Sequence, residues 1–426
     1  MRKREFWLIL MIAGILFLGF GLSFLSTKYL FLVPSDVLLL GFILMIMFLI
    51  AHAVNRMVVP LSSPVILPIA AFLSGLGLML IFRLDNDKAA LQLLWIGMGL
   101  AAFIFTLLIY HNYSKIKQYK YVSGLAGIIL MLSPIFFGIT RGGSKLWLDF
   151  GFFKFQPAEL AKILLVLFFA GYLEEKKELL SSSAKKVKAF FIPRMKHLGP
   201  LVLFWAISLL VLVFERDLGS SLLFFGLFIT MLYIATGRAT YLMIGSVLFV
   251  LGALGTYYVF DHAASRIDMW LNPWADPRAS GYQMIQSLFA IGNGGMAGTG
   301  LGLGYPGLIP AVETDFIFAA VAEELGLFGA ISIIIVYILV IYQGVKIALK
   351  APDDFSKLLA IGLTTIFGLQ SFLIVGGVTK LVPLTGVTLP FMSYGGSSVL
   401  ANFILFALLL VISNRVNYLE VKESHG

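Results

Sequence analysis

The most regular feature of the sequence is the alternation of long apolar runs with short polar connections. A membrane-spanning helix needs about 20 predominantly apolar residues, and about twelve runs approach or reach that length. They cover residues 7–26, 36–53, 64–82, 90–110, 121–139, 157–173, 199–214, 218–236, 241–260, 316–345, 357–377 and 395–413. The pattern predicts an all-α, polytopic integral membrane protein with about twelve spans.

The composition supports this class of protein. Hydrophobic residues make up 60% of the 426 residues and charged residues 12%, about half the charged fraction of a soluble domain. The chain has no cysteine, which excludes disulfides, thiolate catalysis and cysteine-ligated metal sites. Its net charge of +9 comes from basic residues in short loops between the apolar runs. That distribution favours membrane orientation over nucleic-acid binding.

Lysine and arginine mark alternate connections. With twelve spans counted, the basic connections fall on one side, among them the N-terminal residues 2–4, the long 174–198 loop and Arg415. Basic loops stay in the cytoplasm, so both termini are predicted to be cytoplasmic. The first apolar run lacks a small-residue cleavage site and is interpreted as a retained span. The loops that then face outward are 140–156, 261–315 and 378–394.

The outward loop 261–315 concentrates polar and flexible residues. Lipid cannot hydrogen-bond to polar groups, so such a concentration in a membrane protein indicates a working surface. Asp315 stands where the chain re-enters the membrane, either as a reactive carboxylate or as the N-cap of the next helix. Gln283 and Gln286 share a helical face. The glycine-rich run 292–307 can offer N–H groups to phosphate, but it matches no nucleotide-binding motif.

A second polar cluster lies at residues 140–165. Its paired glycines permit an unusual backbone, and Lys145 supplies positive charge. Trp147 suits a membrane interface or the face of a sugar. Glu159 and Lys162 stand three residues apart inside an apolar run, so they can pair or line a cavity. The alternative is a helix-start glutamate beside a snorkelling lysine.

Two further segments combine polar and small residues. Glu215, Arg216 and Asp217 form a charged outward turn between two apolar runs. Arg216 can meet a diphosphate through its guanidinium group, or the turn can simply close a hairpin. Ser397 follows a Tyr-Gly-Gly sequence at the start of the last run. It is predicted either to contact a ligand or to belong to a small-residue face for helix packing.

These segments occur together in one family. The stretches GGSKLWLDFGFFKFQPAELAK, DLGSSLLF, NPWADPRASGYQMIQSLFAIGNGGMAGTGLG, TDFIFAAVAEELG and GVTLPFMSYGGSS follow one another between residues 64 and 415. The chain therefore resembles the SEDS proteins (shape, elongation, division and sporulation), the group of RodA, FtsW and SpoVE. The resemblance implies a ten-helix glycosyltransferase core over 64–415, preceded by an additional hairpin at 1–63 and followed by a cytoplasmic tail at 416–426.

The resemblance further implies a peptidoglycan glycosyltransferase of the bacterial cytoplasmic membrane. Such enzymes polymerise lipid II outside the membrane into β-1,4-linked glycan, with inversion at the donor sugar, and serve elongation, division or sporulation. They work with a class B penicillin-binding protein. The family's catalytic aspartate corresponds to Asp315, its loop tryptophan to Trp147, and the charges of its QPxELxK motif to Glu159 and Lys162.

The implied reaction gives roles to further residues. The attacking sugar hydroxyl needs a base, assigned to Asp315, and the leaving diphosphate needs positive charge, for which Lys162 and one or more of Arg141, Lys145, Arg216 and Arg266 are candidates. The expected substrate contacts are Trp147, Glu159, Lys162, Lys145, Arg216, Arg266, Gln283, Gln286 and Ser397. A divalent cation, Mg²⁺ or Mn²⁺, held by carboxylates is compatible with this chemistry. No other cofactor is expected.

The chain departs from the family pattern just before Asp315. The usual P-E-x-H-T-D-F reads PAVETDF over residues 310–316. Glu313 replaces the usual histidine, and its like charge is expected to raise the pKa of Asp315. Two other functions stay open: a lipid II flippase, for which intramembrane charges and broken helices are typical, and a non-catalytic scaffold of the cell-wall synthesis complex. Formation of glycan from lipid II separates an enzyme from both.

Overall fold

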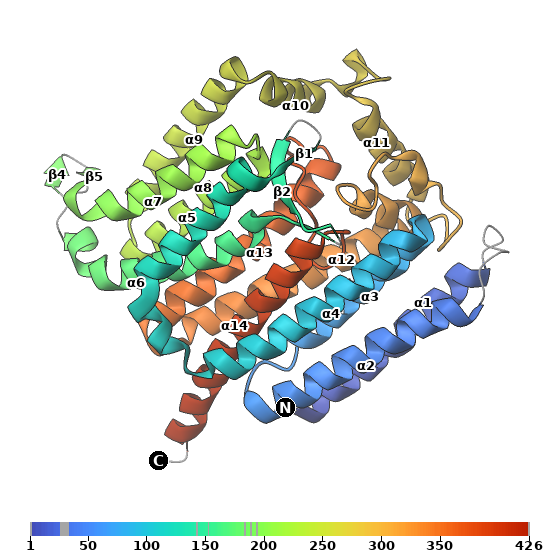
Figure 1. Ribbon diagram of the computed structural model, residues 1–426, viewed down its shortest axis with the longest axis horizontal. Helices are drawn as coiled ribbons and strands as arrows, with labels where there is room; N and C mark the ends of the chain where they lie inside the picture. Colours follow the sequence, from blue (N-terminus) through green and yellow to red (C-terminus); the bar gives the residue numbers. More distant parts are fainter. Residues whose placement is uncertain are drawn as a thin grey trace. The chain divides into compact units, whose positions relative to one another are not determined.

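A computed structural model describes residues 2–25, 34–141, 144–151, 153–182, 185–187, 190–192 and 195–424. The paired Gly142 and Gly143 lie outside these residues, as does the side chain of Arg141. Helices dominate the chain (Figure 1). They are α1 (Arg2–Leu25), α2 (Pro34–Val58), α3 (Ile66–Leu84), α4 (Asn86–Ile109), α5 (Lys120–Phe137), α6 (Pro157–Ser182), α7 (Met195–Phe214), α8 (Leu218–Thr236), α9 (Ala239–Val259), α10 (Asp261–Leu271), α11 (Tyr282–Gly294), α12 (Ile317–Leu349), α13 (Asp354–Val378) and α14 (Gly396–Ser424). Short 3₁₀ helices are η2 (Tyr110–Tyr119), η3 (Pro273–Ala275) and η4 (Pro306–Leu308).

The described part of each predicted apolar run lies mostly on one of these helices. Ten helices in the described part of the chain are long and apolar enough to cross a membrane. The other two predicted spans are 157–173, at the start of α6, and 199–214, a shorter apolar helix within α7. Glu159 and Lys162 interrupt the apolar run in α6. The prediction of an all-α, multi-pass membrane architecture is confirmed.

The chain divides into two compact units, and the first comprises residues 1–111, 266–343 and 370–426. Its central helices are α3 and α14, whose apolar windows are 94% and 89% buried. Glycines let α4 and α14 approach closely: a β-carbon on Gly99 would overlap Phe403, and one on Gly396 would overlap the ring of Trp95. Small residues at such contacts are how membrane helices gain dispersion energy, because lipid gives helices no hydrophobic reason to associate.

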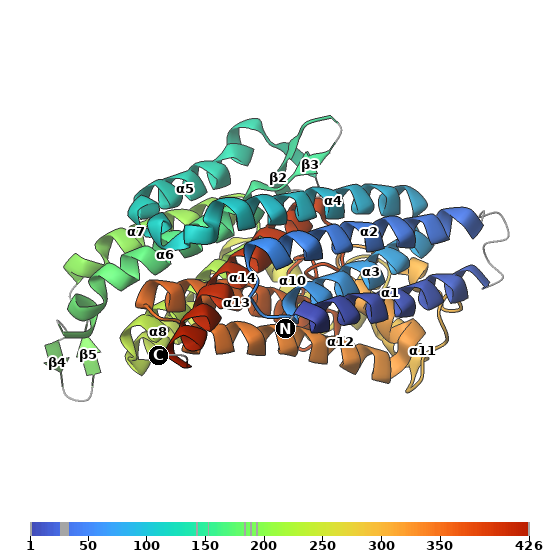
Figure 2. The ribbon, with the colours of Figure 1, turned by 90° about the horizontal axis from the view of Figure 1, so that it is seen from below.

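The predicted N-terminal hairpin belongs to the same unit. Its helices α1 and α2 lie side by side (Figure 2), and α1 also contacts α3. Three buried polar side chains join the two helices. Glu5 Oε1 accepts from Asn55 Nδ2 at 3.0 Å and lies 2.8 Å from His52 Nδ1. Polar groups this deep need partners because hydrocarbon supplies none, so the cluster fixes the pairing of α1 with α2.

The second unit comprises residues 112–265 and 344–369. Aromatic rings fill the contacts between its helices. Gly124 on α5 leaves room for Phe168 and Phe204, whose ring centroids lie 4.3 Å apart. Trp205 on α7 stacks on Phe228 of α8 at 4.7 Å. In contrast, only 6% of the apolar window of α9 is buried, so α9 is an outer helix of this unit.

Two predicted loops contain structure that the apolar pattern did not indicate. Residues 140–156 contribute to an antiparallel sheet of β1 (Ile139–Arg141), β2 (Ser144–Asp149) and β3 (Lys154–Phe155), in which Trp147 lies opposite Ile139. The predicted 174–198 loop is shorter than expected, because α6 continues to Ser182. A hairpin of β4 (Lys185–Val187) and β5 (Phe190–Ile192) follows. Strand pairing satisfies backbone N–H and C=O groups that an irregular loop would leave to water.

Candidate functional site

Asp315 ends a tight turn that leads directly into α12. The N–H groups of Thr314 and Asp315 both donate to the Ala311 carbonyl, at 3.1 and 3.2 Å. Ala311 has a φ of +54°, a left-handed conformation that costs a non-glycine residue roughly 1–3 kcal/mol. Such a conformation persists only where the surrounding structure imposes it. The turn is therefore held by its neighbours.

The neighbour that holds it is the segment entering α14. Ser393 Oγ donates to the Thr314 carbonyl at 2.5 Å, 79 positions away in the sequence. The Tyr394 N–H donates to the Glu313 carbonyl at 2.8 Å. On α4, Gln92 donates to the Ser393 carbonyl at 3.1 Å. The two residues before Asp315 are thus bonded to a segment that α4 itself anchors.

The surroundings of the Asp315 carboxyl group raise its pKa above that of an ordinary aspartate. Burial raises its pKa to about 6, although the residue as a whole is only half-buried. A hydrogen bond from Thr314 and the positive charge of Arg266 act in the opposite direction, and the negative charge of Glu313 adds a smaller increase. The predicted effect of Glu313 is confirmed in direction, but desolvation is the dominant cause.

Arg266 of α10 belongs to the same site. Its Nη1 donates to the Thr385 carbonyl at 2.8 Å. Gly386 is next to both charged groups: a β-carbon built on it would stand 3.6 Å from an Arg266 nitrogen and 3.8 Å from Asp315 Oδ2. The φ of Gly386 is +72°, so this position favours glycine. The first unit therefore brings two predicted site residues, Asp315 and Arg266, together around the 385–386 backbone.

Lys88, at the start of α4, is a residue that the sequence reading missed. Its Nζ lies 2.6 Å from Glu313 Oε1 and 2.9 Å from Asp85 Oδ2. Beside this amine, the pKa of Asp85 is held below its usual value. A signal in the sequence could have identified it. The charged LDNDK segment at 84–88 connects two predicted spans on the predicted outer side, the same side as Glu313.

The glycine-rich run 292–307 has a packing role and does not form the phosphate site that its glycines could have provided. Its glycines bring backbone against backbone: a β-carbon on Gly294 would overlap the Ala322 carbonyl, and one on Gly298 would overlap Glu324. Gly326 has a φ of +66° and kinks α12. At this kink the Leu327 N–H donates to the Gly295 carbonyl at 2.9 Å. The loop is therefore joined to α12 along its backbone.

Acidic side chains occupy the N–H groups that phosphate would need. The Gly302 N–H donates to Glu324 Oε2 at 3.2 Å, and the Tyr305 N–H donates to Glu323 Oε1 at 3.0 Å. Glu324 also forms an ion pair with Arg83, which donates to the Gly304 carbonyl at 2.7 Å. Both glutamates are buried. Buried carboxylates would repel a phosphate, so this loop is a docked structural element.

The two predicted glutamines lie on α11. Gln283 Nε2 donates to the Pro310 carbonyl at 3.2 Å, which ties α11 to the segment before Asp315. Gln286 is half-buried one turn further along. Gln283 therefore supports the Asp315 turn in this structure, and substrate contact by either glutamine stays a prediction.

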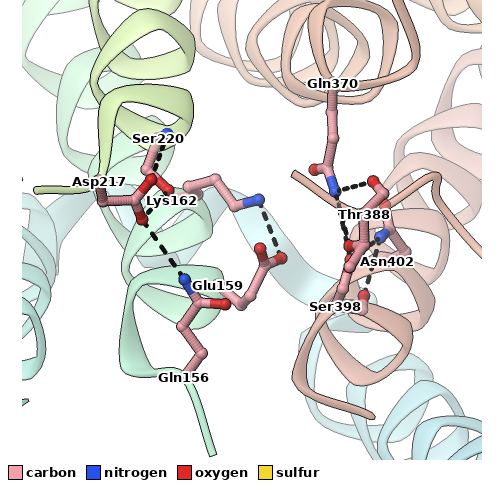
Figure 3. Close-up of polar contacts among 9 residues, drawn as sticks. All are labelled: Gln156, Glu159, Lys162, Asp217, Ser220, Gln370, Thr388, Ser398 and Asn402. Atoms are coloured by element: carbon pink, nitrogen blue, oxygen red, sulfur yellow. Dashed lines mark hydrogen bonds and ion pairs between the residues drawn. The ribbon is translucent and has the colours of Figure 1, made fainter. Parts of the chain in front are cut away.

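The second unit holds the predicted Glu159–Lys162 pair. Lys162 Nζ lies 2.9 Å from Glu159 Oε2 on α6, and both side chains are almost fully buried (Figure 3). At the start of α8, Asp217 accepts from the Ser220 N–H at 2.9 Å and from its hydroxyl at 2.6 Å. Gln156, just before α6, donates to Asp217 at 3.4 Å. Both members of the pair thus belong to this unit, in which Gln156 joins α6 to the capped start of α8.

The predicted charged turn at 215–217 contains two buried carboxyl groups. Glu215 is 4% exposed, and burial raises its pKa to about 8, with the neighbouring Asp217 charge adding to the rise. Glu215 is therefore protonated at neutral pH. Asp217 caps α8 instead of facing outward. Only Arg216 is exposed, at a left-handed φ of +61°. The prediction of a charged outward turn was therefore wrong for Glu215, because protein surrounds this side chain.

Lys145 and Trp147 lie on β2 in the second unit. Lys145 Nζ donates to the Ile135 carbonyl near the end of α5 at 2.6 Å. Trp147 is half-buried in the centre of the strand. Their contact with substrate stays a prediction.

Ser397 is buried in the first turn of α14, in the first unit. Around it, Gln370 of α13 donates to the Thr388 carbonyl at 2.9 Å and to Ser398 Oγ at 3.2 Å, and Asn402 donates to the Ser398 carbonyl at 2.8 Å (Figure 3). These bonds join α13, the preceding loop and α14. Of the two roles predicted for Ser397, ligand contact and helix packing, these surroundings favour helix packing.

The described side chains offer no group of three or more histidine, aspartate or glutamate residues arranged to hold a metal ion. A magnesium ion bound through substrate phosphates needs only one or two carboxylates. The described carboxylates therefore fit a divalent cation only if the phosphates of the substrate supply further ligands.

The comparisons agree on one family. The FtsW, RodA and SpoVE family of cell cycle proteins matches residues 77–418. The peptidoglycan glycosyltransferase RodA of Mycobacterium tuberculosis is 43% identical over 395 residues, which covers 90% of this chain and 84% of that protein. Stage V sporulation protein E of Bacillus subtilis is 34% identical over 330 residues, covering 77% and 87%. A chain from a solved peptidoglycan synthase complex, studied for its coordination of polymerization and crosslinking, has the same fold, with a TM-score of 0.69 at 22% identity over 84% of this chain and 98% of its own length.

Proposed function

Because the chain belongs to the FtsW, RodA and SpoVE family of cell cycle proteins, we propose that Asp315 is the catalytic base with which it polymerises lipid II. The chain is a peptidoglycan glycosyltransferase, as its family membership and its 43% identity to a RodA enzyme indicate.

The reaction is a single displacement at the anomeric carbon of the donor sugar. The 4-hydroxyl oxygen of the acceptor sugar forms a bond to that carbon while its proton passes to Asp315. The bond from the carbon to the lipid diphosphate breaks on the opposite face, and the electron pair leaves with the diphosphate. Inversion of an α-linked donor gives a β-1,4 glycoside without a covalent enzyme intermediate.

The environment of the Asp315 carboxylate is the single observation that carries this assignment. Its pKa of about 6 leaves it ionised at neutral pH, yet it makes a stronger base than an ordinary aspartate, and general bases work best with a pKa near the operating pH. The segment entering α14 donates to the Thr314 and Glu313 carbonyls, and these bonds keep the turn and its carboxylate in place. A fixed carboxylate costs less reorganisation in the transition state.

The developing negative charge on the diphosphate needs cations. Arg266 lies near Asp315, and a guanidinium group can bind a phosphate through two parallel hydrogen bonds. Lys162, Arg216 and Lys145 belong to the other unit, and we propose that they contribute positive charge to the lipid-linked substrate. The Glu159 carboxylate, 2.9 Å from the Lys162 amine, would hold that amine in position.

The site is proposed to face the outside of the cytoplasmic membrane, with both chain termini in the cytoplasm. The distribution of lysine and arginine among the loops supports this orientation. We further propose a class B penicillin-binding protein as the partner, because the similar chain of known structure comes from a complex that coordinates polymerization with crosslinking.

Purified protein incubated with lipid II tests the function and the residue assignment together. Wild-type protein should form glycan polymer, Asp315→Asn should lose it, and Asp276→Asn, a change at an exposed aspartate of the same outward loop, should keep it. Adding a class B partner measures its effect on the rate. Near-normal polymer from Asp315→Asn would remove the base assignment. Movement of lipid II across a vesicle membrane without polymer would indicate a flippase.

A further inference from the structure

Lys88 and Glu313 form an ion pair across 225 positions of sequence. Their charged atoms lie 2.6 Å apart, and the Lys88 amine also reaches Asp85 at 2.9 Å. Glu313 is 14% exposed at its side chain and Lys88 36%, so water screens the pair only partly. Charge pairs with limited exposure act on their neighbours more strongly than fully solvated ones.

This pair acts on the backbone that carries Asp315. Glu313 precedes Asp315 by two residues, and its carbonyl accepts the Tyr394 N–H. Lys88 sits in the first turn of α4, the helix whose Gln92 anchors the Ser393 carbonyl. One helix therefore holds the turn twice, through the Glu313 side chain and through the segment entering α14.

The pair also belongs to the electrostatic surroundings of Asp315. The charged groups that face Asp315 are Arg266 from α10 and Glu313 from its own turn, and Lys88 from α4 acts through Glu313. The segment at 385–394 presents backbone groups and the Ser393 hydroxyl. Without Lys88, Glu313 would be an uncompensated negative charge near a carboxylate that must ionise to act as a base.

We propose that Lys88 is a positioning residue for the transferase reaction: by neutralising Glu313 it holds the Asp315 turn and keeps the Asp315 carboxylate ionised in the working pH range. This rests on the proposed role of Asp315 as base. The same pair shows how the chain accommodates Glu313 in place of the usual histidine. A partly buried glutamate at this position needs a cation nearby, and Lys88 supplies it.

The test is the pH profile of lipid II polymerisation for four proteins: wild type, Lys88→Met, Glu313→Gln and the double variant. Lys88→Met leaves the negative charge of Glu313 unpaired, so the acid limb of the profile should move to higher pH, by about half a unit or more. Glu313→Gln removes the like charge, so the limb should move to lower pH. The double variant removes both charges and should return the limb close to its wild-type position.

Two controls separate this role from a general loss of structure. Lys88→Arg keeps the charge and should keep the wild-type limb. Lys177→Met removes a lysine from an ion pair of the second unit, in which Nζ lies 2.8 Å from Asp354, and should leave the limb unmoved. If Lys88→Met does not fold, the double variant decides the question, because its acid limb should lie at a higher pH than that of Glu313→Gln.

An acid limb that stays in place in both Lys88→Met and Glu313→Gln overturns the inference, whether or not the maximal rate falls. Equal shifts in Lys88→Met and the double variant overturn it too, because they would not pass through Glu313. If Asp315→Asn is inactive while these limbs stay fixed, only the role of Lys88 fails. If Asp315→Asn polymerises normally, the proposed base fails and the inference fails with it.

Discussion

Asp315→Asn is expected to make the protein more stable while making it inactive. Burial raises the pKa of Asp315 from 3.8 to about 6, so the folded state holds the Asp315 proton more tightly than the unfolded state. Ionising the group at neutral pH therefore costs folding free energy, and asparagine has no proton to lose. Active-site groups commonly lower stability in this way, because their function requires an unfavourable environment.

The size of the effect follows from the shift. A difference of about 2 units, at 1.36 kcal/mol per unit, gives about 3 kcal/mol as an upper limit. Asp315 is only half-buried, so solvent screening reduces the effect, and a gain of about 1–2 kcal/mol is expected. The sign gives a pH signature. Because the folded pKa lies above the unfolded one, wild-type stability falls as the pH rises from about 4 to about 6, and this loss is absent in the variant.

Thermal unfolding of the detergent-solubilised proteins between pH 4 and 8 measures this. The melting temperature of Asp315→Asn should exceed that of wild type above pH 6, and the two should converge near pH 4. Asp276→Asn is a control with the opposite sign, because the Ser280 N–H and hydroxyl hold the pKa of Asp276 below its usual value. It should gain no stability at neutral pH.

A lower melting temperature for Asp315→Asn at pH 7.5 would refute the reasoning. In that case the ionised carboxylate would stabilise the fold, as a negative charge near the start of a helix can.

Three further predictions test the loop, the buried pair and the orientation. Gly294→Ala should destabilise the protein by about 1–3 kcal/mol or more, because its β-carbon overlaps the α12 backbone; Gly292→Ala, which meets no atom within 4 Å, should be neutral or slightly stabilising, and equal effects of the two changes would contradict the docked loop. Lys162→Met should lower the free energy of unfolding by about 3–5 kcal/mol, since it leaves its partner carboxylate buried and unpaired, and it should also weaken the use of lipid II; an unchanged melting temperature would contradict the structural pair, and unchanged use of lipid II would contradict the proposed substrate role of Lys162. In intact cells a cysteine at Ala279 should react with an impermeant thiol reagent and one at Glu178 should not, and the reverse pattern would invert the proposed topology.

Hydropathy and short motifs determined most of what could be known from the sequence. The described parts of the twelve apolar runs lie mostly on helices, because a stretch of about 20 apolar residues in lipid must satisfy its own backbone hydrogen bonds, and a helix does so locally. The family followed from motifs of contiguous residues, and Asp315 was singled out because it stands where a polar loop meets an apolar run. The spacing of Glu159 and Lys162 predicted that the two side chains share a helical face and can pair, and they form an ion pair. Each of these inferences uses residues that are close together in the chain.

Only the tertiary structure decided which distant groups meet. Glu313 finds Lys88, Thr314 finds Ser393, and Glu324 finds Arg83, and nothing in the spacing of these residues identifies the partners. The glycine-rich loop packs its backbone against α12, and buried glutamates accept from the N–H groups of Gly302 and Tyr305, which are then not available to a phosphate. Glu215 appeared to be a surface charge by sequence and is a buried acid in the fold. From sequence alone, a charged residue at the end of a helix is compatible with many partners. Its actual partner is determined only when the surrounding helices and loops pack, exclude water and bring one group of opposite charge next to it.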